Sequence, residues 1–150
     1  MLLAHLLMAA GIALIAAPLP PRLWNVGGEA AFALALLTLP GFGFAWWARV
    51  HLGRLWSGAV TLKRGHRVID SGPYALVRHP IYTGLLEAAL VSAVAAGTIA
   101  SVAGFALATL GVWCKARVEE RLLSTELGGQ AYDAYRRRVP MFVPGWRARG

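Results

Sequence analysis

Four long apolar stretches, separated by short polar segments, dominate the chain. They cover about residues 2–17, 30–50, 80–96 and 99–115. A helix of about 20 residues crosses the ~30 Å hydrocarbon core of a bilayer, and lipid forces backbone polar groups to bond within the segment. The pattern therefore predicts an all-α integral membrane protein with about four transmembrane helices, of which the first and third are near the short limit.

A tight helical hairpin is predicted for the last two stretches, because only Gly97-Thr98 separates them. The hairpin is rich in small residues, which let helices approach closely in lipid; these are Gly84, Ala88, Ser92, Ala96, Gly104, Ala108 and Gly111. Beyond it, residues 119–138 carry a helical pattern interrupted by Gly128-Gly129. Tyr132 and Tyr135 share one face of this pattern, so we expect a C-terminal helix outside the bilayer.

Basic residues indicate the orientation. The chain has 15 Lys and Arg residues. Six of them flank or fill the segment 51–79, and eight lie in the tail from Lys115 onwards. The remaining one, Arg22, lies in another connection. Four crossings bring both basic regions to one side, which the positive-inside rule makes cytoplasmic. The sequence thus predicts a multi-pass protein with both termini cytoplasmic, and its Ala- and Arg-rich composition favours a bacterial inner membrane.

Composition supports a single membrane-embedded domain over residues 1–150. Charged residues make up 15% of the chain, against about 25% in soluble domains. The net charge is +8, and the basic residues lie between and after the apolar stretches. This placement favours anionic lipid headgroups over nucleic acid as the partner. The single cysteine, Cys114, excludes an intrachain disulfide and a cysteine zinc site. The first 21 residues lack the basic start of a signal peptide, which favours a retained membrane segment.

The segment Ser71–Gly84, SGPYALVRHPIYTG, is the first candidate for chemistry. Pro80 suits the first turn of a helix, so Arg78 and His79 are expected at the membrane surface just before the third helix. Gly84 leaves room for a bulky group one turn inside that helix, whose N-terminus also favours a carboxylate or phosphate. The alternative is an interfacial belt, in which the basic residues touch headgroups and the tyrosines act as anchors.

A second polar cluster, Arg117–Arg121 with the sequence RVEER, ends the fourth apolar stretch. Arg117 and Glu120 are three residues apart and share a helix face. A solvated helix end held by ion pairs is the alternative. Because this cluster and His79 are predicted on the same side of the membrane, we expect them to converge near the headgroup plane.

Glu87 lies one turn beyond Gly84, within the third apolar stretch. A carboxylate in a membrane helix is a functional candidate by default. It is expected either to touch substrate or a cofactor amine, or to reach the interface and pair with an arginine. Another glycine pattern, PGFGF at residues 40–44, has no strand before it, so it predicts close helix packing and not a dinucleotide site.

Taken together, these strings resemble the isoprenylcysteine carboxyl methyltransferase family and its bacterial relatives. The matching strings occur in family order over about residues 49–145; they are LGRLWSG (52–58), GPYALVRHPIYTG (72–84), the Arg-Glu-Glu run and YDAYRRRVPMFVPG (132–145). The resemblance implies a membrane enzyme that binds S-adenosylmethionine without a Rossmann sheet. The cofactor pocket would open to the cytosol, and a separate tunnel would admit the lipid from the bilayer.

The resemblance also assigns residues to roles. The cofactor pocket would be lined by Tyr74, Val77, His79, Pro80, Tyr82 and Gly84, and closed from the tail by Glu120, Tyr132 and Tyr135. Arg117 and Glu120 are the catalytic candidates, and Glu87 and Arg78 the substrate-binding candidates. The chain departs from the family where Gly128 and Gly129 are doubled, which leaves open which glycine precedes the matching tyrosine.

The resulting hypothesis is methyl transfer from S-adenosylmethionine, with S-adenosylhomocysteine as product, to a lipid-like or prenylated carboxylate. Such in-line displacement needs orientation and desolvation, and Arg117 would hold the carboxylate in bidentate fashion. An amine acceptor would instead need a base such as Glu120 or Glu87, as in a phospholipid N-methyltransferase. An NADPH-dependent reductase of the sterol-reductase type is less favoured, because Ile81 stands where that class has Asn. A non-enzymatic membrane scaffold is the remaining alternative.

Overall fold

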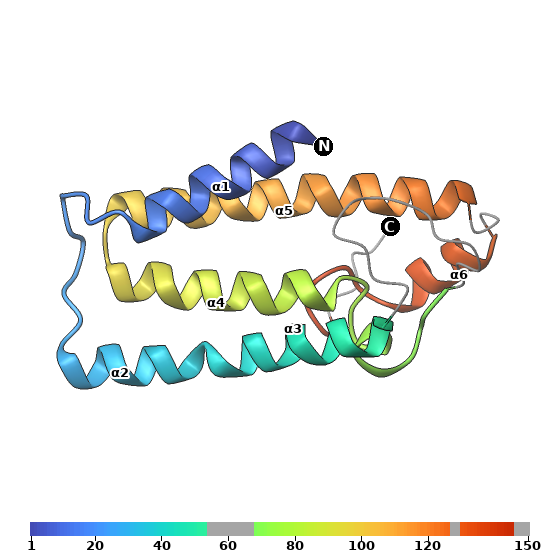
Figure 1. Ribbon diagram of the computed structural model, residues 1–150, viewed down its shortest axis with the longest axis horizontal. Coiled ribbons are helices and arrows are strands. Elements are labelled where there is room, and N and C mark those ends of the chain that lie inside the picture. Colours follow the sequence, from blue (N-terminus) through green and yellow to red (C-terminus); the bar gives the residue numbers. More distant parts are fainter. Residues whose placement is uncertain (54–67, 127–129, 146–150) are drawn as a thin grey trace.

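The computed structural model describes residues 1–53, 68–126 and 130–145, and within these parts every regular element is a helix. The elements are α1 (Leu2–Ala16), α2 (Gly28–Leu37), α3 (Leu39–Leu52), the 3-10 helix η2 (Gly72–Ala75), α4 (Pro80–Ala96), α5 (Ile99–Glu126) and α6 (Gln130–Arg138). In Figure 1, α1 to α5 form an elongated bundle, and η2 and α6 gather at one of its ends. The mostly helical prediction is confirmed.

Two helical segments are long and apolar enough to cross a membrane, Gly28–Leu52 and Ile99–Thr125. The apolar helices α1 and α4 are shorter, with 15 and 17 residues. At 1.5 Å per residue these two are roughly 22 and 26 Å long, somewhat less than the ~30 Å of bilayer hydrocarbon.

The second apolar stretch differs from the single helix that the sequence predicts. It divides at Thr38 into α2 and α3, which follow each other in the same general direction (Figure 1). The cause is Pro40, which has no N–H to donate to a carbonyl one turn earlier. The Thr38 hydroxyl donates to the carbonyl of Ala35 at 2.7 Å, which satisfies one acceptor near the break.

Helix α5 is longer than its apolar stretch. The sequence predicts an end near Lys115, whereas the helix continues to Glu126. No Gly or Pro occurs between residues 112 and 126, so nothing in the backbone interrupts it. The RVEER cluster therefore lies inside a continuous helix. The doubled Gly128-Gly129 falls outside the described residues.

Small residues bring the backbones of two helix pairs into contact, α1 with α5 and α3 with α4. A Cβ added to Gly11 would lie 2.5 Å from the carbonyl oxygen of Gly104, and one added to Gly84 would overlap the carbonyl of Gly41. The glycines at 84 and 104 thus serve packing against α3 and α1. The turn between α4 and α5 is closed by Gly97, whose φ of 63° is left-handed.

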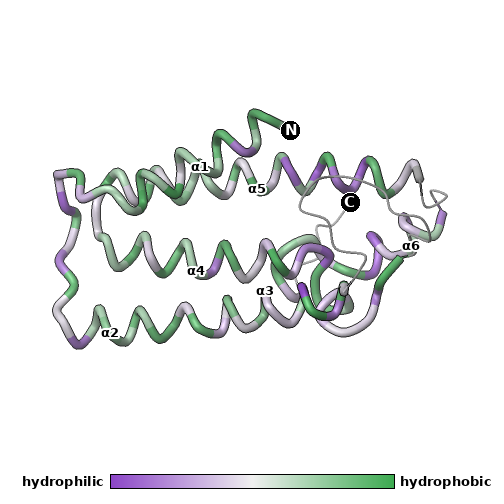
Figure 2. The backbone as a smooth tube through the Cα atoms, viewed as in Figure 1, coloured by the Kyte–Doolittle hydropathy of each residue, from purple (hydrophilic) through white to green (hydrophobic). Residues whose placement is uncertain are grey.

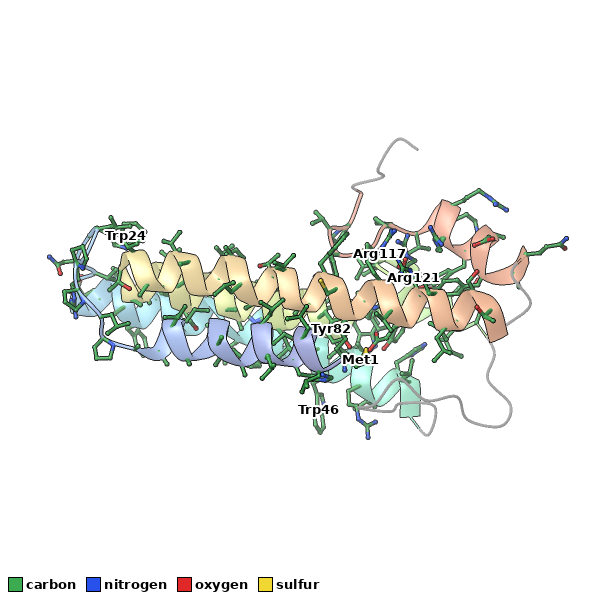
Figure 3. All side chains as sticks on the ribbon, turned by 90° about the horizontal axis from the view of Figure 1, so that it is seen from above. Met1, Trp24, Trp46, Tyr82, Arg117 and Arg121 are labelled. Atoms are coloured by element: carbon green, nitrogen blue, oxygen red, sulfur yellow. The ribbon has the colours of Figure 1, made fainter. Side chains whose placement is uncertain are left out.

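The polar residues are concentrated at the α6 end of the bundle and in the connection between α1 and α2 (Figure 2). Trp24, in that connection, lies at the opposite end from Arg117 and Arg121 (Figure 3). Elements at the α6 end carry eight basic residues of the charge prediction; these are Arg49, Arg78, Lys115, Arg117, Arg121, Arg136, Arg137 and Arg138. The others that it used, Arg54, Lys63, Arg64, Arg67, Arg147 and Arg149, lie outside the described residues.

The contact between α3 and α4 gives a matched pair of substitutions. Gly41→Ala is expected to destabilise the fold by about 1–3 kcal/mol, because the new Cβ would overlap the Glu87 carboxylate and lie 2.6 Å from the carbonyl oxygen of Gly84. Gly43→Ala meets nothing within 4 Å and is expected to be neutral or slightly stabilising, since alanine favours helix. Thermal unfolding in detergent compares the two, and equal midpoints would contradict the close contact.

Candidate functional site

The segment before α4 and the tail after α6 bind each other through their backbones. The Arg78 N–H donates to the Pro140 carbonyl at 2.8 Å, and the His79 N–H donates to that of Met141 at 3.1 Å. The Thr83 hydroxyl adds a bond of 2.8 Å to the Phe142 carbonyl. As predicted, Pro80 opens α4, which leaves the two basic side chains just outside the helix. The chain thus brings two distant motifs to one place.

Glu120 of α5 is the centre of the resulting polar cluster. The residue is 2% exposed, and its Oε1 accepts from Arg78 Nε at 2.6 Å. The same oxygen lies 3.3 Å from His79 Nε2, and Arg136 Nε lies 3.9 Å from Oε2. The predicted convergence of His79 and Glu120 is therefore present in the structure.

Arg78 also fastens the tail. Its Nη1 donates to the carbonyls of Arg136 at 3.1 Å and Val139 at 2.5 Å, while its Nε is bonded to Glu120. Five donors in a planar fork let a single guanidinium make all three bonds. The sequence places this arginine among the substrate-binding candidates, whereas in the structure it links α5 to the last turn of α6 and to Val139 after it.

Glu119, to which the sequence assigned no role, extends the polar cluster around His79. Its Oε1 accepts from the Tyr82 hydroxyl at 2.6 Å and lies 3.8 Å from Lys115 Nζ, and its Oε2 lies 3.6 Å from His79 Nδ1. Both ring nitrogens of His79 therefore face a carboxylate. Lys115, 6% exposed, was missed as well. The four-residue spacing of Lys115 and Glu119 on one helix was the signal that could have found the pair.

Aromatic rings flank His79. The Tyr82 ring is stacked on the imidazole, with centroids 5.6 Å apart and an interplanar angle of 13°, and the Phe142 ring lies 5.8 Å away. Flat faces of this kind suit a flat heterocycle or a cation.

Three of the four tyrosines predicted to line or close the pocket, Tyr74, Tyr132 and Tyr135, are buried. The Tyr135 hydroxyl donates to the Tyr74 carbonyl at 2.7 Å, which ties α6 to η2. Burial raises the pKa of all three phenols well above the usual value, so they remain neutral at physiological pH. Val77 is fully buried beside them, and Val139 packs with the α6 tyrosines.

Three residues with predicted roles, Arg117, Gly84 and Glu87, lie apart from this cluster. Arg117 is on an exposed face of α5, with its guanidinium 5.7 Å from the Trp113 ring centroid. A contact between it and Glu120 is not among those of the described residues. Gly84 faces α3, so the space that the sequence assigns to a bulky ligand is filled by a neighbouring helix. Arg117 and Glu120 are three residues apart on α5, so their side chains diverge by about 60° around the helix. This divergence lets Glu120 be buried while Arg117 is exposed.

Glu87 packs against Gly41 of α3. Its Oε2 is buried and has no hydrogen-bond partner among the described residues. An unpaired buried carboxylate oxygen costs free energy unless something satisfies it. This observation keeps Glu87 as a candidate for binding a donor group.

Residues 33–125, more than half of the chain, match the sequence model of the isoprenylcysteine carboxyl methyltransferase (ICMT) family. The chain belongs to this family. It is also similar to the protein-S-isoprenylcysteine O-methyltransferase of Schizosaccharomyces pombe, with 31% identity over 99 residues that cover 65% of this chain and 42% of the relative. A second relative is the cobalt-zinc-cadmium resistance protein CzcN of Cupriavidus metallidurans, 32% identical over 98 residues. The chain therefore spans less than half the length of either relative, since it covers 43% of the second.

Enzymes of the ICMT family use S-adenosylmethionine, and the donor set of the cluster fits that group. Its ammonium and hydroxyl groups suit carboxylates such as Glu119 and Glu120. Its own carboxylate suits a guanidinium within reach of solvent, such as Arg136, whose side chain is 41% exposed. Its flat base suits the ring faces of His79 and Tyr82.

Proposed function

We propose that the chain catalyses methyl transfer from S-adenosylmethionine to the carboxylate of a lipid-like, prenylated acceptor, as a single membrane-embedded domain. The observation that carries the proposal is the position of His79 between the carboxylates of Glu119 and Glu120. This arrangement joins the RHPxYxG segment and the Arg-Glu-Glu run of an ICMT-family sequence at the polar end of an apolar bundle. The cofactor supplies an electrophilic methyl carbon, and the protein has to bind, orient and dehydrate the two reactants.

The cofactor-binding set stays as the sequence predicts it, with Glu119 added. Tyr74, Val77, Pro80 and the two α6 tyrosines shape the wall, while His79, Tyr82 and the paired carboxylates face the ligand. We place Gly84 in a supporting role, because α3 covers it. Glu120 remains the catalytic candidate, since it is the buried anion nearest to His79.

A carboxylate acceptor is already ionised at neutral pH, so the site needs a cation to hold it and no base. The structure offers Lys115, buried beside Glu119, whereas the sequence indicates Arg117. We favour Lys115, because it lies between the polar cluster and the apolar part of α5. An acceptor entering from the lipid would meet its ammonium first.

The proposed setting is the cytoplasmic face of a bacterial inner membrane. Four helices would cross the bilayer, with α1 and α4 accommodated by local thinning or snorkelling. Both termini would be cytoplasmic, and the basic residues of α6 would contact anionic headgroups. Fusing a reporter that is active on one side of the membrane to either terminus tests this orientation.

Cofactor binding is tested by calorimetry of the detergent-solubilised protein with S-adenosylhomocysteine and, separately, with NADPH. We expect binding of the first and none of the second. Binding of NADPH alone would support the reductase alternative, and binding of neither would support the scaffold. His79→Ala is expected to weaken S-adenosylhomocysteine binding roughly tenfold or more, because both carboxylates lose their shared partner. Unchanged affinity would show that the pocket is elsewhere.

The acceptor-binding cation is tested with two matched variants on α5, Lys115→Met and Arg117→Met. Lys115→Met is expected to lower kcat/KM for a prenylated cysteine carboxylate about 100-fold, because the acceptor loses a charge-assisted hydrogen bond. Arg117→Met should change it less than about threefold, as expected for a surface residue. The reverse result would return the role to Arg117.

An amine acceptor is the second candidate, and the unpaired Glu87 oxygen favours it. An ammonium group would satisfy this carboxylate, and methylation would require the loss of its proton. Analysis of lipids from cells that express the protein separates the two reactions. Methylated phosphatidylethanolamine would establish the amine reaction.

A further inference from the structure

Helix α1 lies outside the residues that match the ICMT family model, yet it contributes a side chain to the polar cluster. His5 Nε2 lies 3.3 Å from Lys115 Nζ, across the contact between α1 and α5. Figure 3 places Met1, at the start of this helix, at the same end of the molecule as Tyr82 and Arg117. The first helix is therefore more than a membrane anchor, because it reaches the proposed acceptor-binding cation.

The hydrogen bonds of His5 define its tautomer. Its Nδ1 lies 2.9 Å from the Met1 carbonyl oxygen, which can only accept, so Nδ1 carries the proton. The Lys115 ammonium can only donate, so Nε2 must offer its lone pair. Both contacts are satisfied by the same neutral imidazole.

Close packing fixes this contact. Ala4 is 4% exposed, and a Cβ added to Gly111 would lie 2.8 Å from its carbonyl oxygen. On α5, Gly111 lies one helical turn before Lys115. On α1, Ala4 lies next to His5. The close backbone contact is therefore adjacent to the contact between the two side chains. Since backbones in van der Waals contact leave little freedom to slide, α1 holds the imidazole against the ammonium.

We propose that His5 is a positioning residue, which holds the Lys115 ammonium beside Glu119 in the orientation that receives the acceptor carboxylate. This inference rests on the proposed function. His5 Nε2 and Glu119 Oε1 together hold the Lys115 ammonium, one from α1 and the other from its own helix. Glu119 of α5 in turn accepts from the Tyr82 hydroxyl of α4, so three helices meet at this contact.

The experiment measures kcat and KM for the acceptor in wild type, His5→Gln and His5→Phe. His5→Phe is expected to raise the acceptor KM roughly tenfold, because the ammonium loses a charge-assisted hydrogen bond. His5→Gln, whose amide oxygen can accept the same bond, should retain most activity.

Two controls separate a positioning role from a structural one. Leu3→Ala, at a residue 66% exposed on the same helix, should leave the acceptor KM unchanged. Affinity for S-adenosylhomocysteine should be the same in all variants. If His5→Phe keeps the wild-type KM, or if His5→Gln and His5→Phe lose activity equally with a lower unfolding midpoint, the proposal is overturned.

A spectroscopic measurement keeps the inference testable even if no transfer is found. Nitrogen-15 NMR of the detergent-solubilised protein, assigned with His5→Gln, should show the Nδ1–H tautomer of His5. The Nε2 resonance should shift in Lys115→Met. An Nε2–H tautomer at neutral pH would refute the contact, whereas absent S-adenosylhomocysteine binding with the expected tautomer would refute only the proposed function.

Discussion

Glu120→Gln is expected to lower methyl transfer by roughly 100-fold or more and to destabilise the protein in the same variant. The carboxylate is buried and bonds to Arg78 at 2.6 Å and His79 at 3.3 Å. An amide of the same size keeps the volume but removes the charge, so a buried guanidinium is left without its anion. Loss of one partner of a buried pair costs about 3–5 kcal/mol, and loss of a preorganised polar group at a reaction centre costs about 100-fold in rate.

Thermal unfolding in detergent and transfer of a labelled methyl group would measure the two effects. Glu29→Gln is the matched control, since the same change is made at an exposed residue in the first turn of α2. We expect that control to stay within about 0.5 kcal/mol of wild type. A Glu120→Gln protein that is as stable and as active as the control would remove Glu120 from the site.

The second large effect is expected for Arg78→Ala, which should release the residues after α6 from the bundle. Three bonds of this side chain, to Glu120 and to the carbonyls of Arg136 and Val139, hold the tail against α5. Their loss leaves two carbonyls without this donor. Among the ion pairs of the described residues, the buried Glu120 then keeps only the longer contacts to His79 and Arg136, so we expect destabilisation of about 3–5 kcal/mol. Arg78→Lys should recover only part of this, because an ammonium is a point donor and cannot span three acceptors.

Limited proteolysis reports the release directly, as faster cleavage near the C-terminus. Arg138→Ala serves as the comparison, because its guanidinium is 66% exposed and pairs with Asp70 at 3.2 Å on the surface. Such pairs contribute about 0–1 kcal/mol, so cleavage should stay close to the wild-type rate. Equal cleavage of both variants would mean that the α6 tyrosines and the backbone bonds to Pro140 and Met141 hold the tail, and not the Arg78 side chain.

The position of the paired Glu119 and Glu120 shows where sequence reasoning reached its limit. The spacing of charges along one helix identifies neighbours three or four residues apart, and from this the RVEER run is a visible cluster. The rotation of the helix about its own axis is invisible in such a pattern. Only packing against α1 and α4 decided that Lys115, Glu119 and Glu120 face inward while Arg117 stacks on Trp113 at the surface.

The glycines illustrate the same division. Their concentration in the last two apolar stretches indicates close approach of helices. Which helix packs against each glycine depends on the tertiary structure, because a glycine indicates a close contact without identifying the other helix. In the structure Gly84 meets α3 and Gly104 meets α1.

By itself the sequence determined the helical class, the apolar stretches, the turn at Gly97-Thr98 and the two polar motifs, because these depend on local periodicity and composition. Tertiary structure alone decided the partners of each small residue and the contact of His5 with Lys115. Contacts between residues 110 positions apart arise from helix packing, and the energies that select it are sums over many side chains at once.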